Sequence, residues 1–76
     1  MATSFVIMNV PRLIENGVLI KLSKVREITN INSLFGEQYN LMAKIEAKDV
    51  KSLNKIITNN IRTIEGIKKI KKLKAK

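Results

Sequence analysis

The chain has 76 residues, 45% of them hydrophobic, which suits one small domain, residues 1–76, with a single core. It contains no Cys and no His, which excludes disulfides, zinc sites built on these residues and histidine-based catalysis, so we expect no enzymatic activity, catalytic residue, metal or cofactor. The formal net charge is +9, and because so small a domain buries little surface alone, oligomerisation is the expected source of further burial.

The N-terminal segment predicts no targeting or membrane role. Its apolar run, residues 5–10, has no basic segment before it and is far shorter than the about 20 apolar residues that a membrane-spanning helix needs. We therefore expect a soluble cytoplasmic protein with no membrane partner.

The first third of the chain predicts a strand followed by a helix. Residues 5–10 form a short apolar run that Pro11 ends, which is typical of a buried central strand. Pro11 suits the first turn of a helix, and apolar residues then recur at spacings of three or four. This stripe predicts an amphipathic helix ending near its last member and comprises Leu13, Ile14, Val18, Leu22 and Val25.

The middle of the chain predicts a β-hairpin. Residues 28–35 are rich in β-branched side chains and Asn, and the segment 36–38 contains Gly36 and polar residues, which indicates a turn. Apolar and polar residues then alternate from Tyr39 to Ala47, the period of a half-buried strand.

A second helix and a last strand complete the order of elements. Asp49 suits the N-cap position of the helix, and Gly66 stands where a glycine commonly ends one. The apolar stripe of this helix comprises Val50, Leu53, Ile56, Ile57, Ile61 and Ile64. Residues 67–74 predict a strand with a lysine-rich face.

An internal repeat supports a two-unit architecture. Val25, Ile28, Ile31 and Leu34 recur 39 positions later as Ile64, Ile67, Ile70 and Leu73. Two β-α-β units give an α+β, ferredoxin-like βαββαβ fold, a four-stranded antiparallel sheet with two helices on one face. The three-residue spacing does not fit a flat strand, so we expect a β-bulge in each copy. The other face of the sheet stays partly apolar, and a second copy of the chain is the natural partner to cover it.

The hairpin connection holds the side chains best suited to bind a small molecule, namely Gly36, Glu37, Gln38, Tyr39 and Asn40. Backbone N–H groups there would take a carboxylate, and acid and amide oxygens would take an ammonium. The alternative interpretation is a polar turn with one packing aromatic side chain.

The C-terminal end, residues 68–76, is strongly basic. Its candidate phosphate contacts are Lys68, Lys69, Lys71, Lys72, Lys74 and Lys76, with no acidic residue among them. Because such segments attract phosphate without sequence preference, a nucleic-acid-binding accessory role is the alternative function, beside that of a plain solvated segment. An aromatic content of 4% disfavours RNA recognition by base stacking.

Residues 28–66 resemble the ligand-sensing (RAM) domain of the Lrp/AsnC family of transcriptional regulators. The resemblance lies in the apolar run into Gly36-Glu37, in Tyr39-Asn40 opening a strand that ends AKIEAKD, and in the helix end IRTIEGI. It implies a homo-oligomer in which two sheets form a dimeric α/β barrel and dimers assemble further. It also implies an amino acid effector bound between dimers at the hairpin, at Gly36, Tyr39 and Asn40 with Glu37 and Gln38 beside them.

The resemblance also implies how such a chain acts. Full-length regulators of the family carry a helix-turn-helix domain before this one, whereas here the first strand lies at the N-terminus. The resemblance therefore implies a stand-alone sensing domain with no sequence-specific DNA binding of its own. It would act through its assembly state or by docking with full-length regulators. The hairpin departs from the family pattern of glycine, any residue, tyrosine and aspartate, because Gln38 is inserted and Asn40 replaces the aspartate. This exchange removes a charged partner for an effector ammonium.

Overall fold

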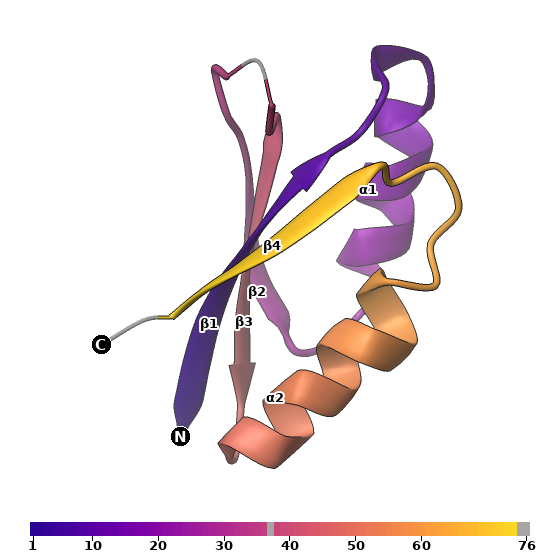
Figure 1. Cartoon of the computed structure of the whole chain (residues 1–76). Helices are drawn as coiled ribbons and strands as arrows, with labels where there is room; N and C mark the ends of the chain where they lie inside the picture. The colour runs from indigo at the N-terminus through magenta and orange to yellow at the C-terminus, as the bar shows by residue number, and fades with distance from the viewer. Residues whose placement is uncertain (37, 75–76) are drawn as a thin grey trace.

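Four strands form one antiparallel sheet in the order β2-β3-β1-β4, and two helices cover one of its faces (Figure 1). The computed structural model describes residues 1–36 and 38–74. In chain order the elements are β1 (Ala2–Asn9), the short 3-10 turn η1 (Arg12–Ile14), α1 (Glu15–Ser23), β2 (Ile28–Ser33), β3 (Leu41–Ala47), α2 (Val50–Ile56), the π-helical turn η2 (Ile57–Ile61) and β4 (Lys69–Lys74). The predicted ferredoxin-like fold is confirmed, as is the central position of the first strand.

The core lies between the sheet and the helices, and the alternation along β3 supplies four of its thirteen buried residues. Every second residue of β3, from Leu41 to Ala47, is buried, as predicted. The rest of the core comprises Val6, Met8 and Val10 from the first strand and its end, Val18 and Leu22 from α1, and Leu53, Ile57, Ile61 and Ile64 from α2 and the segment after it. Each large side chain buried in this way contributes about 1.5–3 kcal/mol.

The first helix differs from its prediction at both ends. It ends at Ser23 rather than near Val25, and of its predicted apolar stripe only Val18 and Leu22 are buried. Leu13 is fully exposed because it lies in η1, where a turn of three residues replaces the 3.6 of an α-helix and changes the direction of the side chain.

One of the two predicted β-bulges exists. The pairing of β2 with β3 shifts register between Ile28 and Asn30, which keeps Ile28 and Ile31 both on the helix-covered face. The prediction of a second bulge, in the last strand, is wrong, because β4 pairs with β1 without a shift in register. Ile70 therefore faces the helices opposite Met8, and Leu73 lies on the other face.

The start of α2 was predicted correctly and its end was not. The Asp49 carboxylate accepts a hydrogen bond of 2.7 Å from the backbone N–H of Ser52, and this bond lowers the pKa of Asp49. The helical segment ends at Ile61, well before Gly66. Gly66 instead takes a left-handed φ of 96° in the connection to β4, where any Cβ would clash with Ile14 Cδ1.

The face of the sheet away from the helices, the open face, is partly apolar. The register places Phe5, Ile7, Met42 and Leu73 on it, together with Asn30, Asn32, Lys44, Lys69 and Lys71. Its apolar centre is flanked by amides on β2 and lysines on β4. Within the part of the chain that is described, no helix is long and apolar enough to cross a membrane.

Candidate functional site

The hairpin connection (residues 34–40) is tied to the end of β1. The backbone N–H of Asn40 donates to the Met8 carbonyl at 2.9 Å, and the N–H of Leu34 donates to the Asn40 carbonyl at 2.8 Å. The side-chain amide of Asn9 adds a bond of 2.7 Å to the Gln38 carbonyl. The connection therefore lies beside the segment that leads from β1 into α1.

Asn40 links these two segments through its side chain. Its Oδ1 accepts from the backbone N–H of Val10 at 2.8 Å, and its Nδ2 donates to the Val10 carbonyl at 2.7 Å and to Glu15 Oε1 at 2.9 Å. Only an amide can accept and donate in this way, since an ionised aspartate has no hydrogen to donate. Asn40 thus fixes both the start of β3 and the carboxylate of Glu15.

Two neighbouring clefts open between the hairpin connection and the β1–α1 segment. One has a volume of about 550 Å³ and extends from Asn9 to Gly36. The other, the charged cleft, has a volume of about 370 Å³ and is lined by Arg12, Glu15, Asn16, Ser33, Leu34, Phe35 and Asn40. Both volumes fall in the range of small-molecule sites, about 300–1,000 Å³.

The structure divides the predicted site residues between two sides of the connection. Gly36 and Asn40 line the cleft of about 550 Å³, and Asn40 also lines the charged cleft. Gln38 and Tyr39 line a third hollow, of about 530 Å³, which Ile7 of the open face joins. Gly36 borders this hollow too, and a Cβ on it would lie 3.0 Å from the Tyr39 carbonyl oxygen. Glu37 lies outside the described residues.

Sequence reasoning missed two charged residues at this site, Arg12 and Glu15. Both line the charged cleft, and Glu15 is half-buried against Asn40. No spacing in the sequence connects position 15 with position 40, because the two meet only through the pairing of β1 with β3.

Phe35 gives the site an apolar rim. Its side chain is fully exposed at the tip of the connection and borders all three hollows. This side chain therefore adds apolar surface to the edge of each hollow.

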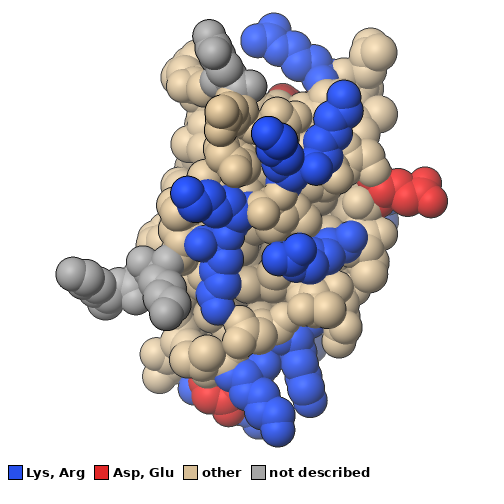
Figure 2. Space-filling view, in the orientation of Figure 1, with Lys and Arg blue, Asp and Glu red and all other residues tan. Residues whose placement is uncertain are grey.

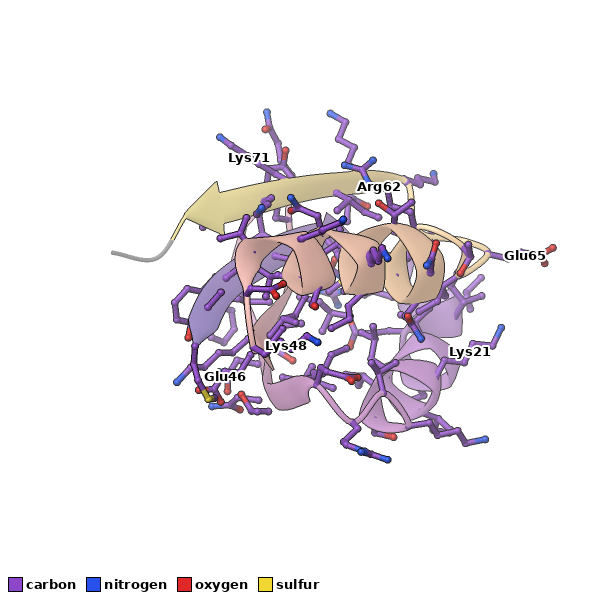
Figure 3. The ribbon with its side chains drawn as sticks, turned by 90° about the horizontal axis from the view of Figure 1, so that it is seen from below. Lys21, Glu46, Lys48, Arg62, Glu65 and Lys71 are labelled. Carbon is purple, nitrogen blue, oxygen red and sulfur yellow. The ribbon has the colours of Figure 1, made fainter. Side chains whose placement is uncertain are left out.

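The C-terminal lysines do not form one patch. Lys69 and Lys71 lie on the open face, and Figure 3 shows Lys71 projecting from β4 away from α2. Lys72 lies on the opposite face, where its Nζ donates to Asn54 Oδ1 at 2.6 Å. Lys68 is exposed in the connection before β4, and Lys76 and the side chain of Lys74 lie outside the described part. Even so, basic side chains outnumber acidic ones on the face that Figure 2 shows, across which β4 runs.

A fourth hollow, about 570 Å³, lies between α1 and the turn before β4, from Leu13 to Gly66, and contains none of the predicted site residues. Over residues 1–36 and 38–74 no group of three acidic side chains is arranged to hold a metal ion.

Comparison with known proteins identifies the family and the fold. A family model described as the Lrp/AsnC ligand binding domain matches residues 15–73. The crystal structure of FFRP-DM1 matches with a TM-score of 0.91 and 30% sequence identity over 100% of both chains. A hypothetical protein from Pyrococcus horikoshii, PHS023, matches with a TM-score of 0.89 and 30% identity over 100% of this chain and 90% of that one.

A third solved structure matches in fold alone. It is the transcriptional regulator NMB0573 from Neisseria meningitidis in complex with L-Met, with a TM-score of 0.86 and 10% identity over 99% of this chain and 49% of that one. Comparison with the curated proteins gives no match.

Proposed function

The chain belongs to the family of Lrp/AsnC ligand binding domains, and we propose that it is an effector-binding module that takes a free amino acid or a similar zwitterion at the hairpin connection. The observation that carries this proposal is the pair of clefts beside residues 34–40, one of which is lined by both Arg12 and Glu15. The family is one of regulatory domains, and the chain lacks the residues of common catalytic sites, so we propose binding without catalysis.

An amino acid is the first effector class to test. The neisserial regulator with the same fold was solved with L-Met bound, and the clefts here have the volume for a ligand of that size. A role in transcription regulation would place the protein in the cytoplasm, and this location forms part of the proposal.

We further propose that the module is a homo-oligomer whose open face is covered by a second copy, as a dimeric α/β barrel. Phe5, Ile7 and Met42 occupy the centre of that face, and no element of the described chain covers them. A ligand held where copies meet would change the free energy of assembly, which is how binding could be transmitted to a full-length regulator docked on the module.

A thermal-shift panel of the twenty amino acids tests the proposal. A ligand at 100 times its dissociation constant stabilises a protein by about 2.7 kcal/mol. In a domain of this size each kcal/mol raises the Tm by about 4–8 °C, so a selective increase of about 10 °C or more is expected. A flat panel at millimolar ligand contradicts amino acid binding. A native mass at the monomer value throughout the micromolar range contradicts the assembly mechanism.

Nucleic-acid binding is a second candidate, favoured by the exposure of Lys68, Lys69 and Lys71. Three phosphate contacts would make log K fall with log salt at a slope of about −3. Two of these lysines lie on the open face, so a dimer formed through that face would compete with nucleic acid. Undetectable DNA binding at low salt removes this candidate.

A further inference from the structure

The positive charge of the protein is concentrated in its C-terminal third. Residues 50–76 hold nine of the 15 basic residues and one of the six acidic ones, so they carry a net charge of +8, whereas residues 1–49 carry +1. The one acid, Glu65, projects from the turn after η2, away from α2 (Figure 3). The excess charge therefore belongs to α2, η2 and the strand β4 with its flanking residues.

One exposed side of the helical segment carries basic side chains at helical spacing. Lys51 and Lys55 are four positions apart, and Thr58 and Arg62 continue the same spacing. All four side chains are exposed, and residues three or four apart lie on one side of a helix. No acidic residue occurs from position 50 to position 64, so no neighbour within the segment neutralises this stripe.

Lys72 of β4 extends the stripe across the sequence. Its Nζ donates to Asn54 Oδ1 at 2.6 Å, which places the ammonium beside α2. Asn54 lies three positions after Lys51 and hence on the same side of the helix. An amide carries no charge, so this bond positions the ammonium without neutralising it. The surface formed in this way, the α2–β4 face, has four cations, namely Lys51, Lys55, Arg62 and Lys72.

The α2–β4 face has polar groups between its cations and no apolar centre. Asn54 and Thr58 are exposed there, and amides and hydroxyls bond phosphate oxygens well. Among the large apolar side chains that are exposed in the described residues, only Val50, at the start of α2, and Leu73, on the open face, belong to α2, η2 or β4. A protein partner needs apolar or aromatic anchors near the centre of its contact, and this surface provides none.

We propose that the α2–β4 face binds the phosphate backbone of a double-stranded nucleic acid without sequence preference. A duplex presents closely spaced negative charges and requires no apolar contact. Single strands are bound largely by stacking of bases on aromatic side chains, and α2, η2 and β4 contain no aromatic residue. This inference rests on the second candidate function and deepens it by naming the surface and the form of nucleic acid.

The α2–β4 face stays accessible if the protein assembles through its open face. The helices cover the opposite side of the sheet (Figure 1), so a second copy packed on Phe5 and Ile7 leaves α2 uncovered. Lys69 and Lys71 lie on the open face and would be covered by that copy. Binding through the α2–β4 face is therefore compatible with assembly, whereas binding through the open face is not.

Fluorescence anisotropy with a short labelled DNA duplex of mixed sequence tests the inference. Four phosphate contacts make log K fall with log salt at a slope of about −3.6. A triple variant that keeps one of the four cations should have a slope of about −1 and bind at least about tenfold more weakly at about 0.1 M salt. It comprises Lys51→Gln, Lys55→Gln and Arg62→Gln. Glutamine favours a helix about as well as the residues replaced, so the fold should persist, and the Tm checks this.

Three controls separate position from net charge. A second triple variant removes the same charges at exposed positions on α1 and just after it, and should change the slope by less than about 1. It comprises Lys21→Gln, Lys24→Gln and Arg26→Gln. The open-face double variant, Lys69→Gln with Lys71→Gln, should change the slope equally little. The variant Lys51→Arg with Lys55→Arg keeps both charges and should bind as the wild type does.

The outcomes separate the inference from the second candidate function. If the duplex binds and either the α1 triple variant or the open-face variant weakens binding as much as the α2–β4 triple variant, the inference is overturned and nucleic-acid binding stands. Tighter binding of single-stranded DNA of the same length overturns the choice of a duplex. Binding of polyglutamate or of vesicles containing phosphatidylserine as tight as that of the duplex overturns the choice of nucleic acid. If the wild-type protein binds no DNA at low salt, both the second candidate function and the inference are overturned.

Discussion

Asn40→Asp should destabilise the fold, although it restores the residue of the family pattern. The variant loses both bonds that Asn40 Nδ2 donates, at 2.7 Å to the Val10 carbonyl and at 2.9 Å to Glu15 Oε1. The new carboxylate would also face a second carboxylate at hydrogen-bonding distance. One lost bond is to a neutral acceptor and one to a charged acceptor, so we expect a loss of about 3 kcal/mol.

Thermal unfolding at fixed protein concentration measures this effect. About 3 kcal/mol corresponds to a decrease in Tm of more than about 10 °C in a domain of this size. The introduced carboxyl binds a proton more readily beside Glu15 than in the unfolded chain. The variant should therefore regain stability relative to the wild type as the pH falls from 7 to 4.

The double variant Asn40→Asp with Glu15→Gln provides the control. Its glutamine amide can donate to the new carboxylate, which restores one bond and removes the repulsion, so part of the lost Tm should return. An Asn40→Asp variant that unfolds within about 2 °C of the wild type at pH 7 would refute the role assigned to the Asn40 amide.

Three further perturbations test other parts of the structure. Gly66→Ala should destabilise by about 1–2 kcal/mol, because the left-handed φ of 96° is strained for a residue with a Cβ, while the end of the Ile14 side chain can move aside. The control Gly17→Ala should stabilise by about 1 kcal/mol in urea unfolding, since its Cβ would meet nothing within 4 Å. Asp49→Ala should lower the Tm at pH 7, because the helix loses its N-cap. The difference in Tm from the wild type should shrink as the pH falls below 3.8 and through the lowered pKa of Asp49, because the wild-type carboxylate is then protonated. A difference in Tm that does not change with pH would contradict the role of Asp49 as a cap. Ile7→Lys should shift the native mass in light scattering toward the monomer by placing a charge at the centre of the open face, whereas Ile20→Lys, on the exposed side of α1, should leave it unchanged.

Local patterns in the sequence predicted the parts of the fold that local physics decides. The alternation from Leu41 to Ala47 and the cap at Asp49 depend only on neighbouring residues, and both are confirmed. The predicted burial of Leu13 and the predicted bulge in the last strand failed. The burial of Leu13 depended on whether the turn that contains it would be 3-10 or α-helical. The bulge depended on how the last strand pairs with β1, which is distant in the sequence. Periodicity does not determine either choice.

The candidate site shows the same division between local and tertiary information. The hairpin was located correctly, and Asn40 was singled out as one of the polar residues of its connection. Arg12 and Glu15 were not, because a pair of charges in an exposed first turn looks like a solvated surface until β1 and β3 are paired. The bond between Glu15 and Asn40 is what gives Glu15 a fixed position, and it is invisible in a single sequence.

Ligand binding and assembly should be coupled in this domain for a physical reason. The charged cleft has Phe35 as one wall, and that side chain is fully exposed in the single chain. A second copy packed over Phe35 would bury apolar surface and also exclude water from the cleft, where the charged bonds to a zwitterion are strengthened by desolvation. A ligand in the cleft would in turn neutralise the charges of Arg12 and Glu15, and burying these charges in water-free surroundings without a counter-charge would oppose the approach of that copy. Each event lowers the cost of the other, and by linkage an effector that binds the assembled form more tightly must promote assembly to the same degree.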